Sequence, residues 1–257
     1  MKNKVELWKE LNHDALQLCR EILNKLRTQG PNDIFAHIYG AFLHKAIETL
    51  AAVNVLYETS LEEQAQILVR VLFELRITFD CFLHMASKNT AADACRRVID
   101  SMMLEKIKQA RASDFVGIPS EVKQNLEKVE DEIKLRYSPE DVNRMRKHGF
   151  TGLPIEQRAS MTGHEQAYSI VYRNFSRNVH STDYVENYLK TGIYKVDDWD
   201  EYRGHRDVAA HYTAHFAAVG MVAFANHVFH LGFEKELGEL GKRQQLIKRG
   251  DVDLAQP

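Results

Sequence analysis

Long stretches of helical periodicity, interrupted at few places, constrain this chain most. Its 257 residues include only 5 prolines and 13 glycines, and most of these lie between the periodic stretches. Proline and glycine weaken or end helices, so this placement predicts long helices joined by short loops. With 44% hydrophobic residues the chain can bury a large core. We therefore predict an all-α fold, an elongated helical bundle in a single domain over residues 1–257.

Capping residues and helix breakers set the predicted helix ends. Asn32 or Asp33 can cap a second helix, and Ser60 with Glu63 has the spacing of a capping box. Thr90 with Asp93 marks another start. The predicted helices cover residues 4–28, about 33–57, 60–87, 90–113, 120 to a break at 138, 139–147, 164–181, 183–189, 206–231 and 233–248, with a loop over 192–205 and a frayed tail over 250–257.

Residues 119–149 differ in composition from the rest of the chain. Between Glu121 and Lys147 there are seven acidic and seven basic residues. The Ser138-Pro139 pair places a cap and a first-turn proline in the middle, which indicates a new helix start. We predict a charged helical hairpin, or arm, within the domain. Its charges are typical of a solvated helix face, and a surface that docks a protein partner is the alternative.

One apolar stretch is long enough for a membrane span. Val208 to Leu231 contains no Asp, Glu, Lys or Arg, and about 20 apolar residues can cross a bilayer. The stretch is rich in Ala, however, and carries four His and one Asn. We predict a helix buried in the centre of a bundle and no membrane partner.

Charge and cysteine content restrict the class of protein further. The net charge is -2 and the pI is about 6.6, whereas a general nucleic-acid coat protein would be far more basic. The cysteines Cys19, Cys81 and Cys95 are odd in number and far apart, without zinc-ligand spacing. They predict buried free thiols in a reducing cytoplasm, and no disulfide framework.

The predicted 164–181 helix carries reactive side chains on one stripe. Tyr172, Ser176 and His180 follow at i, i+4 and i+8, so they share a face. Arg173 lies seven positions before His180 and projects from the same side. An Arg that binds a phosphate and a His that moves a proton are the minimum for cutting RNA without a metal.

A second polar stripe lies on the apolar 60–87 helix. Gln66, Arg70, Glu74 and Thr78 recur every four residues, and burying a charged pair is costly unless polar partners meet it. An Arg before a Glu is the less favourable order for a local pair. We therefore predict that this stripe faces the Tyr172–His180 stripe. It either fixes helix register or lines a functional pocket.

These two stripes together resemble a known group. Arg70-x-x-x-Glu74 with Tyr172-x-x-x-Ser176-x-x-x-His180 is similar to a bacterial family of all-helical proteins, largely of unknown function, linked to the HEPN superfamily (higher eukaryotes and prokaryotes nucleotide-binding). Active HEPN ribonucleases carry an Arg and a His separated by a short spacer, often with Asn directly after the Arg. Here Asn174 follows Arg173. The resemblance covers about residues 61–189.

The resemblance implies a metal-independent endoribonuclease without a cofactor, in a toxin or phage-defence setting. His180 would be the general acid or base on a ribose 2′-hydroxyl, and Arg173 would hold the scissile phosphate. Asn174 and Ser176 would orient these groups. Arg70, Glu74 and Tyr172 would support the site, and Arg177 is a second choice for the phosphate role. RNA is the implied partner, and a homodimer would bring two such helices together.

Two other classes of function stay open. The same pocket could belong to a non-catalytic helical module that binds a ligand or a partner. A metal-dependent bundle enzyme could use His211 and His215, which share a helix face with Asp207, because two His four residues apart can bind one metal. Structural histidines are the plainer interpretation of that row. Trp199 and Tyr202, in the predicted 192–205 loop, would anchor the loop or stack on a base.

Overall fold

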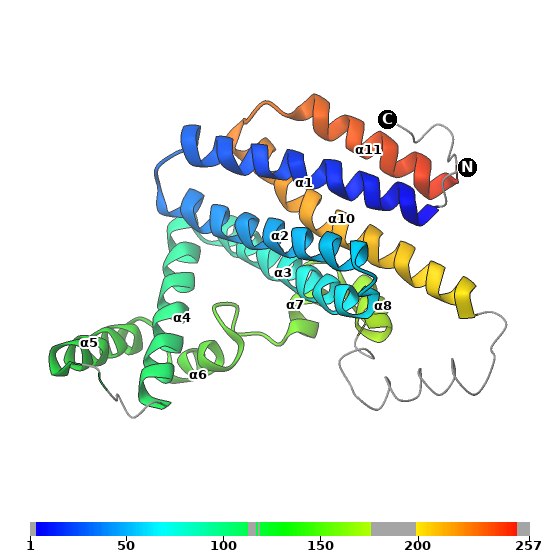
Figure 1. Ribbon diagram of the computed structural model, residues 1–257. Coiled ribbons are helices and arrows are strands. Elements are labelled where there is room, and N and C mark those ends of the chain that lie inside the picture. The colour runs from blue at the N-terminus through cyan, green and yellow to red at the C-terminus, as the bar shows by residue number, and fades with distance from the viewer. Residues whose placement is uncertain (1–3, 113–116, 118, 176–198, 251–257) are drawn as a thin grey trace. The chain divides into compact units, whose positions relative to one another are not determined.

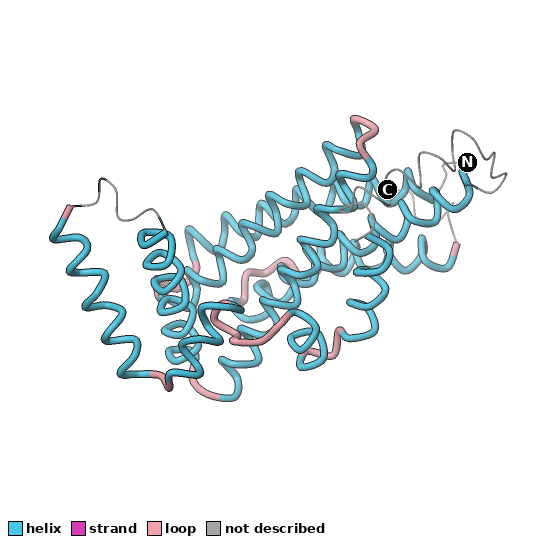
Figure 2. Tube along the Cα trace, turned by 90° about the horizontal axis from the view of Figure 1, so that it is seen from below, coloured by secondary structure: helices cyan, strands magenta, loops and turns pink. Residues whose placement is uncertain are grey.

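The described part of the chain is helical throughout. The computed structural model describes residues 4–112, 117, 119–175 and 199–250, and describes their side chains except at 173, 174 and 199–203. Within these residues there is no strand (Figure 2), which confirms the all-α prediction. The helices, shown in Figure 1, are α1 (Lys4–Gln29), α2 (Ile34–Glu58), α3 (Glu62–Lys88), α4 (Ala91–Ala112), α5 (Ser120–Arg136), α6 (Pro139–His148), α7 (Ile155–Met161), α8 (Glu165–Phe175), α10 (Trp199–Phe229) and α11 (Glu234–Arg249).

Three of the predicted helix starts are confirmed by their caps. The Asp33 carboxylate accepts from the Ala36 backbone N–H at 2.8 Å. Ser138 accepts from the Asp141 N–H at 3.1 Å with Pro139 in the first turn. Thr90 accepts from the Asp93 N–H at 3.0 Å. Ser60 behaves differently, because its φ of 57° places it outside α3 in the left-handed region.

Contacts divide the chain into two compact units. The first comprises Met1–Arg76 and Gln166–Pro257, and the second comprises Ile77–Glu165. Helix α3 contributes residues to both units. The prediction of a single domain over residues 1–257 stays a prediction.

Helix α10 is the central element of the first unit. It packs against α1 and α2, and α11 packs against α1 on the side away from α2 (Figure 1). Small side chains allow this close packing, because Ala210, Ala214, Ala217, Ala218 and Ala225 are fully buried. The prediction of a buried helix at 208–231 is confirmed. Among the described residues, Gly204–Phe229 is long and apolar enough to cross a membrane. Within its apolar 18-residue stretch, 56% is buried inside the protein, as in the core helix of a bundle.

The start of α10 corrects one prediction. The helix begins at Trp199 rather than near 206, so Trp199 and Tyr202 lie on a helix and not on a loop. Residues 199–203 contain no Pro or Gly, and a single Gly204 weakens a long helix too little to end it.

In the second unit α4, α5 and α6 pack together around a small apolar core. Leu104, Ile133, Val142 and Met145 are all buried in it. The arm therefore is helical as predicted, but its charges are not all solvated. The Glu130 side chain is only 3% exposed and receives hydrogen bonds from Arg111 and Arg146. Docking of a protein partner on the arm stays a prediction.

The three cysteines are buried free thiols, as predicted. Burial raises the pKa of both Cys19 and Cys81 to about 12. Thiolates are the reactive form of cysteine, so these two side chains act as small apolar core residues.

Candidate functional site

An ion pair on α3 is the first element of the candidate site. The Arg70 Nε donates to Glu74 Oε1 at 2.8 Å. The two residues lie one helical turn apart, so the helix itself brings them together. Their side chains are 23% and 31% exposed, so the pair is only partly buried.

The ring of Tyr172 on α8 covers the Arg70 guanidinium. The Arg70 Cζ lies 4.6 Å from the ring centroid, a cation–π contact that contributes about 0.5–1 kcal/mol at exposed sites. Tyr168, one turn earlier on α8, has its ring centroid 5.6 Å from that of Tyr172. Tyr168 is buried, whereas Tyr172 is 40% exposed. The α3 stripe therefore meets α8 through Arg70 and Tyr172, as predicted.

The remaining predicted catalytic residues lie at or beyond the end of this helix. Arg173 and Asn174 directly follow Tyr172 on α8, and their side chains are outside the described residues. Ser176, Arg177 and His180 also lie outside the described residues. The predicted roles of all five stay predictions.

The two ends of the α3 stripe have other partners. The Gln66 amide donates to Asp207 Oδ1 at 3.2 Å and accepts from Arg206. Thr78 accepts from Arg158 Nη1 at 3.1 Å. Gln66 and Thr78 therefore have these partners, and the prediction that the whole stripe faces the Tyr172–His180 stripe stays a prediction, because Ser176 and His180 lie outside the described residues. A step of four residues is slightly more than one helical turn, so the four side chains point in progressively different directions along α3.

Asp207 is the centre of a half-buried polar cluster that the sequence did not reveal. Besides Gln66, the Tyr57 hydroxyl donates to Asp207 Oδ1 at 3.3 Å. Burial raises the pKa of the Asp207 carboxyl above its ordinary value, although Gln66 and Tyr57 oppose the shift. Perturbed carboxyls of this kind are enriched at functional sites. The sequence had placed Asp207 only in the His211–His215 row.

A second pair missed from the sequence joins Asp80 and His164 in the other unit. The His164 Nε2 lies 2.7 Å from Asp80 Oδ2, with both side chains about 15% exposed (15% and 16%). The only signal in the sequence was an acidic residue inside the apolar run of α3. Since His164 directly precedes α8, the pair holds the chain at the point where α8 begins.

His211 and His215, the alternative metal pair, belong to a buried network around Asn12. Asn12 Nδ2 donates to His211 Nδ1 at 3.2 Å, and His215 Nδ1 donates to Asn12 Oδ1 at 3.1 Å. These bonds assign Nε2–H to His211 and Nδ1–H to His215. Burial lowers the pKa of His211 to about 3 and that of His215 to about 4. Both rings are therefore neutral at pH 7.

The residues around His211 and His215 do not support a metal site. Over the residues that the structure describes, there is no group of three or more His, Cys, Asp and Glu side chains that could hold a metal ion. Asp207 and the two histidines also have different partners. Asp207 bonds to Tyr57 and Gln66, whereas the rings of His211 and His215 both bond to Asn12.

Comparison with known proteins assigns the chain to a family. Residues 36–192 match a family of unknown function, DUF5677, and the chain belongs to this family. The matched range contains α3 and α8, and therefore the Arg70, Glu74 and Tyr172 cluster. No curated protein and no solved structure matches the chain.

Proposed function

We propose that the protein is a metal-independent endoribonuclease of the HEPN type, acting in the cytoplasm as a toxin or phage-defence effector. The proposal rests on the contact of the Arg70 guanidinium with the Tyr172 ring, 4.6 Å from the ring centroid. This contact attaches the α3 ion pair to the helix on which Arg173 and Asn174 lie. Arg173 and His180, which share a stripe in the sequence, would then present the phosphate-binding and proton-transferring groups.

The proposed reaction is an intramolecular transesterification. Neutral His180 takes the proton of a ribose 2′-hydroxyl, whose oxygen attacks the adjacent phosphorus. The bond from phosphorus to the 5′-oxygen breaks, and that oxygen takes a proton from the His180 imidazolium or from water. The products are a 2′,3′-cyclic phosphate and a 5′-hydroxyl. Arg173 neutralises the charge that develops on the phosphate oxygens, and Asn174 and Ser176 orient the two groups.

The Arg70–Glu74 pair has a supporting role in this proposal. The Arg70 guanidinium bonds to Glu74 and lies over the Tyr172 ring at once, and its planar group of donors suits this double contact better than the compact ammonium of a lysine. It thereby fixes the turn of α8 that precedes Arg173. A homodimer that brings two such helices together would place two copies of the site side by side.

Alanine substitutions at the two arginines separate their roles. We expect Arg173→Ala to lower RNA cleavage by at least about 100-fold, as the loss of a transition-state donor does elsewhere. Arg177→Ala is the matched control and should retain most of the activity. Equal loss in both variants would contradict the assignment of the phosphate to Arg173. Specific RNA binding without cleavage in the wild type would favour the non-catalytic module.

A further inference from the structure

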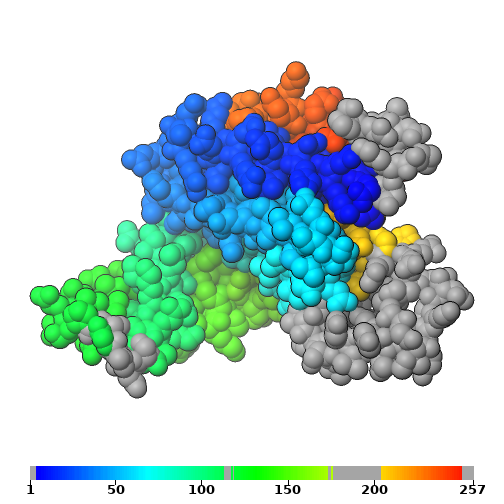
Figure 3. Space-filling model, viewed as in Figure 1, coloured from blue at the N-terminus to red at the C-terminus, as the bar shows by residue number. Residues whose placement is uncertain are grey.

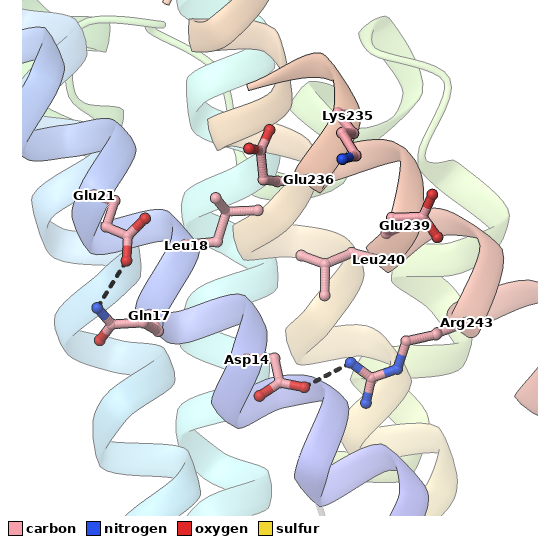
Figure 4. A pocket seen from close by; sticks show the side chains of 9 residues that line it. All are labelled: Asp14, Gln17, Leu18, Glu21, Lys235, Glu236, Glu239, Leu240 and Arg243. Atoms are coloured by element: carbon pink, nitrogen blue, oxygen red, sulfur yellow. Dashed lines mark hydrogen bonds and ion pairs between the residues drawn. The ribbon is translucent and has the colours of Figure 1, made fainter. Parts of the chain in front are cut away.

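Helix α1 separates two surfaces of opposite charge in the first unit. On the face shown in Figure 3, α1 runs between α11 and α2. The groove between α1 and α11 has a volume of about 420 Å³, and Leu18 and Leu240 form its apolar floor (Figure 4). Carboxylates outnumber cations around it, and Arg243 is bonded to Asp14 at 2.6 Å. The acidic residues are Asp14, Glu21, Glu236 and Glu239, and the basic ones are Lys235 and Arg243.

The opposite side of α1 is basic. Two adjoining grooves of about 490 and 470 Å³ lie between α1 and α2, and both are lined by Arg27 and His44. Arg20 lines one groove and His37 the other. The one acidic residue lining them is Glu48, whose Oε1 lies 3.5 Å from His44 Nε2. We call these two grooves together the α1–α2 basic surface.

Arg20 and Arg27 dominate this surface. They lie seven residues apart, so they project from the same side of α1 about 10 Å apart along its axis. Both are exposed. Across residues 4–112, 117, 119–175 and 199–250, neither side chain forms a hydrogen bond or an ion pair, in contrast to the side chains of Arg70, Arg136 and Arg243. Their guanidinium donors are thus available to a ligand.

The groove floor beside Arg27 leaves room for a ligand. Gly40, Ala36 and Ala41 line it with the smallest side chains. A Cβ added at Gly40 would meet nothing within 4 Å. A chain of phosphates and sugars could therefore approach the α2 backbone without displacing protein atoms.

We propose that the α1–α2 basic surface binds the phosphate backbone of single-stranded RNA, as a contact separate from the cleavage site. The choice of RNA rests on the proposed function. Guanidinium groups bind phosphate oxygens with paired donors, and a positive groove that follows the backbone is typical of proteins that hold single strands. The acidic α1–α11 groove repels the same ligand, which directs the strand to the α2 side of α1.

Binding in a cleavage-deficient background tests this contact. His180→Ala protein would be titrated into fluorescein-labelled oligouridine over a series of salt concentrations. Removing two phosphate contacts should reduce the slope of log affinity against log salt by about 1.4. We expect Arg20→Ala/Arg27→Ala to show this smaller slope and about tenfold weaker binding at low salt. Lys128→Ala/Arg249→Ala, which removes two exposed charges elsewhere, is the matched control and should leave the slope unchanged.

A second variant changes the shape of the groove and leaves its charges in place. Gly40→Leu fills the floor beside Arg27 and raises helix propensity, so it should fold. It is expected to weaken oligouridine binding at least threefold, at a melting temperature no lower than that of the wild type.

Equal affinities and slopes for the arginine variant and its control would overturn the proposal, as would no RNA binding by the His180→Ala protein. Cleavage of the same RNA by the wild type reports on the proposed function separately. Cleavage that persists with unchanged affinity in the Arg20→Ala/Arg27→Ala background would contradict the α1–α2 contact alone.

Discussion

The Arg70 guanidinium lies against the ring of Tyr172, with its Cζ 4.6 Å from the ring centroid. The two residues belong to helices far apart in the sequence, α3 and α8. Arg70 also bonds to Glu74, so one side chain joins an ion pair to an aromatic ring. This arrangement fixes α8 on α3 at the turn where the proposed catalytic residues begin.

Removing the Tyr172 ring should therefore impair both stability and cleavage. We expect Tyr172→Ala to lower the free energy of unfolding by about 1 kcal/mol, since a cation–π contact and a partly exposed ring are lost. RNA cleavage should fall by more than the loss of stability explains, because α8 is then no longer held against Arg70. Tyr172→Phe keeps the ring and should behave like the wild type in chemical denaturation and in a cleavage assay. Full activity in Tyr172→Ala would refute the supporting role.

The stability of the protein should fall in mild acid. The pKa of His211 is lowered to about 3 and that of His215 to about 4 by burial, from about 6.5 in an unfolded chain. Above pH 6.5 both states are neutral and pH has no effect through these groups. As the pH falls from 6.5 towards 4, only the unfolded chain takes up the protons, so the folded state loses roughly 3 kcal/mol per histidine.

Urea denaturation at several pH values between 7 and 4 measures this loss. His211→Phe should preserve the stacking on Tyr57, whose ring centroid lies 4.1 Å from that of His211, and remove one of the two titrating groups. Its free energy of unfolding should depend less on pH than that of the wild type. A free energy that is constant from pH 6.5 to 4 in the wild type would show that these rings are not buried in the neutral form.

Glu130 should be essential to the three-helix part of the second unit. Its carboxylate is 3% exposed and lies among Arg111, Lys134 and Arg146. Burial opposes ionisation, but the hydrogen bond and charge of Arg111, with the charges of Lys134 and Arg146, hold the pKa of Glu130 below its ordinary value. Glu130→Gln removes the anion that three cations share, and should cost about 2 kcal/mol because those cations are themselves 34–48% exposed. Glu132→Gln, at a position 66% exposed, is the control, and equal melting temperatures for the two variants would contradict the account.

Much of the helical architecture could be predicted because its signals are local. Asp33, Thr90 and Ser138 mark helix starts through bonds to residues three positions away, and such bonds depend only on nearby sequence. The start of α10 at Trp199 was missed, since an aromatic and acidic composition is compatible with either loop or helix. Ser60 has the spacing of a cap, yet the turn after α2 gives it a φ of 57°.

The candidate site could be predicted only in part, because periodicity gives the face of a helix and not its partner. The Arg70 and Tyr172 stripes were visible in the sequence, and their contact followed from the need to satisfy a half-buried charge. The partners of His211 and His215 were not visible, since Asn12 lies on α1, about two hundred residues away. For the same reason the sequence placed Asp207 only in a row with His211 and His215 and gave no sign of its bonds to Tyr57 and Gln66.

Incubation of the pure protein with mixed RNA in excess EDTA, beside a His180→Ala variant, tests the central claim most directly. We predict that the wild type alone cleaves the RNA and leaves 2′,3′-cyclic phosphate ends, because His180 and Arg173 need no metal. Cleavage by both proteins would contradict the assignment of His180. Cleavage that stops in EDTA would contradict the metal-independent mechanism, and no cleavage by either protein would contradict the assignment of a ribonuclease.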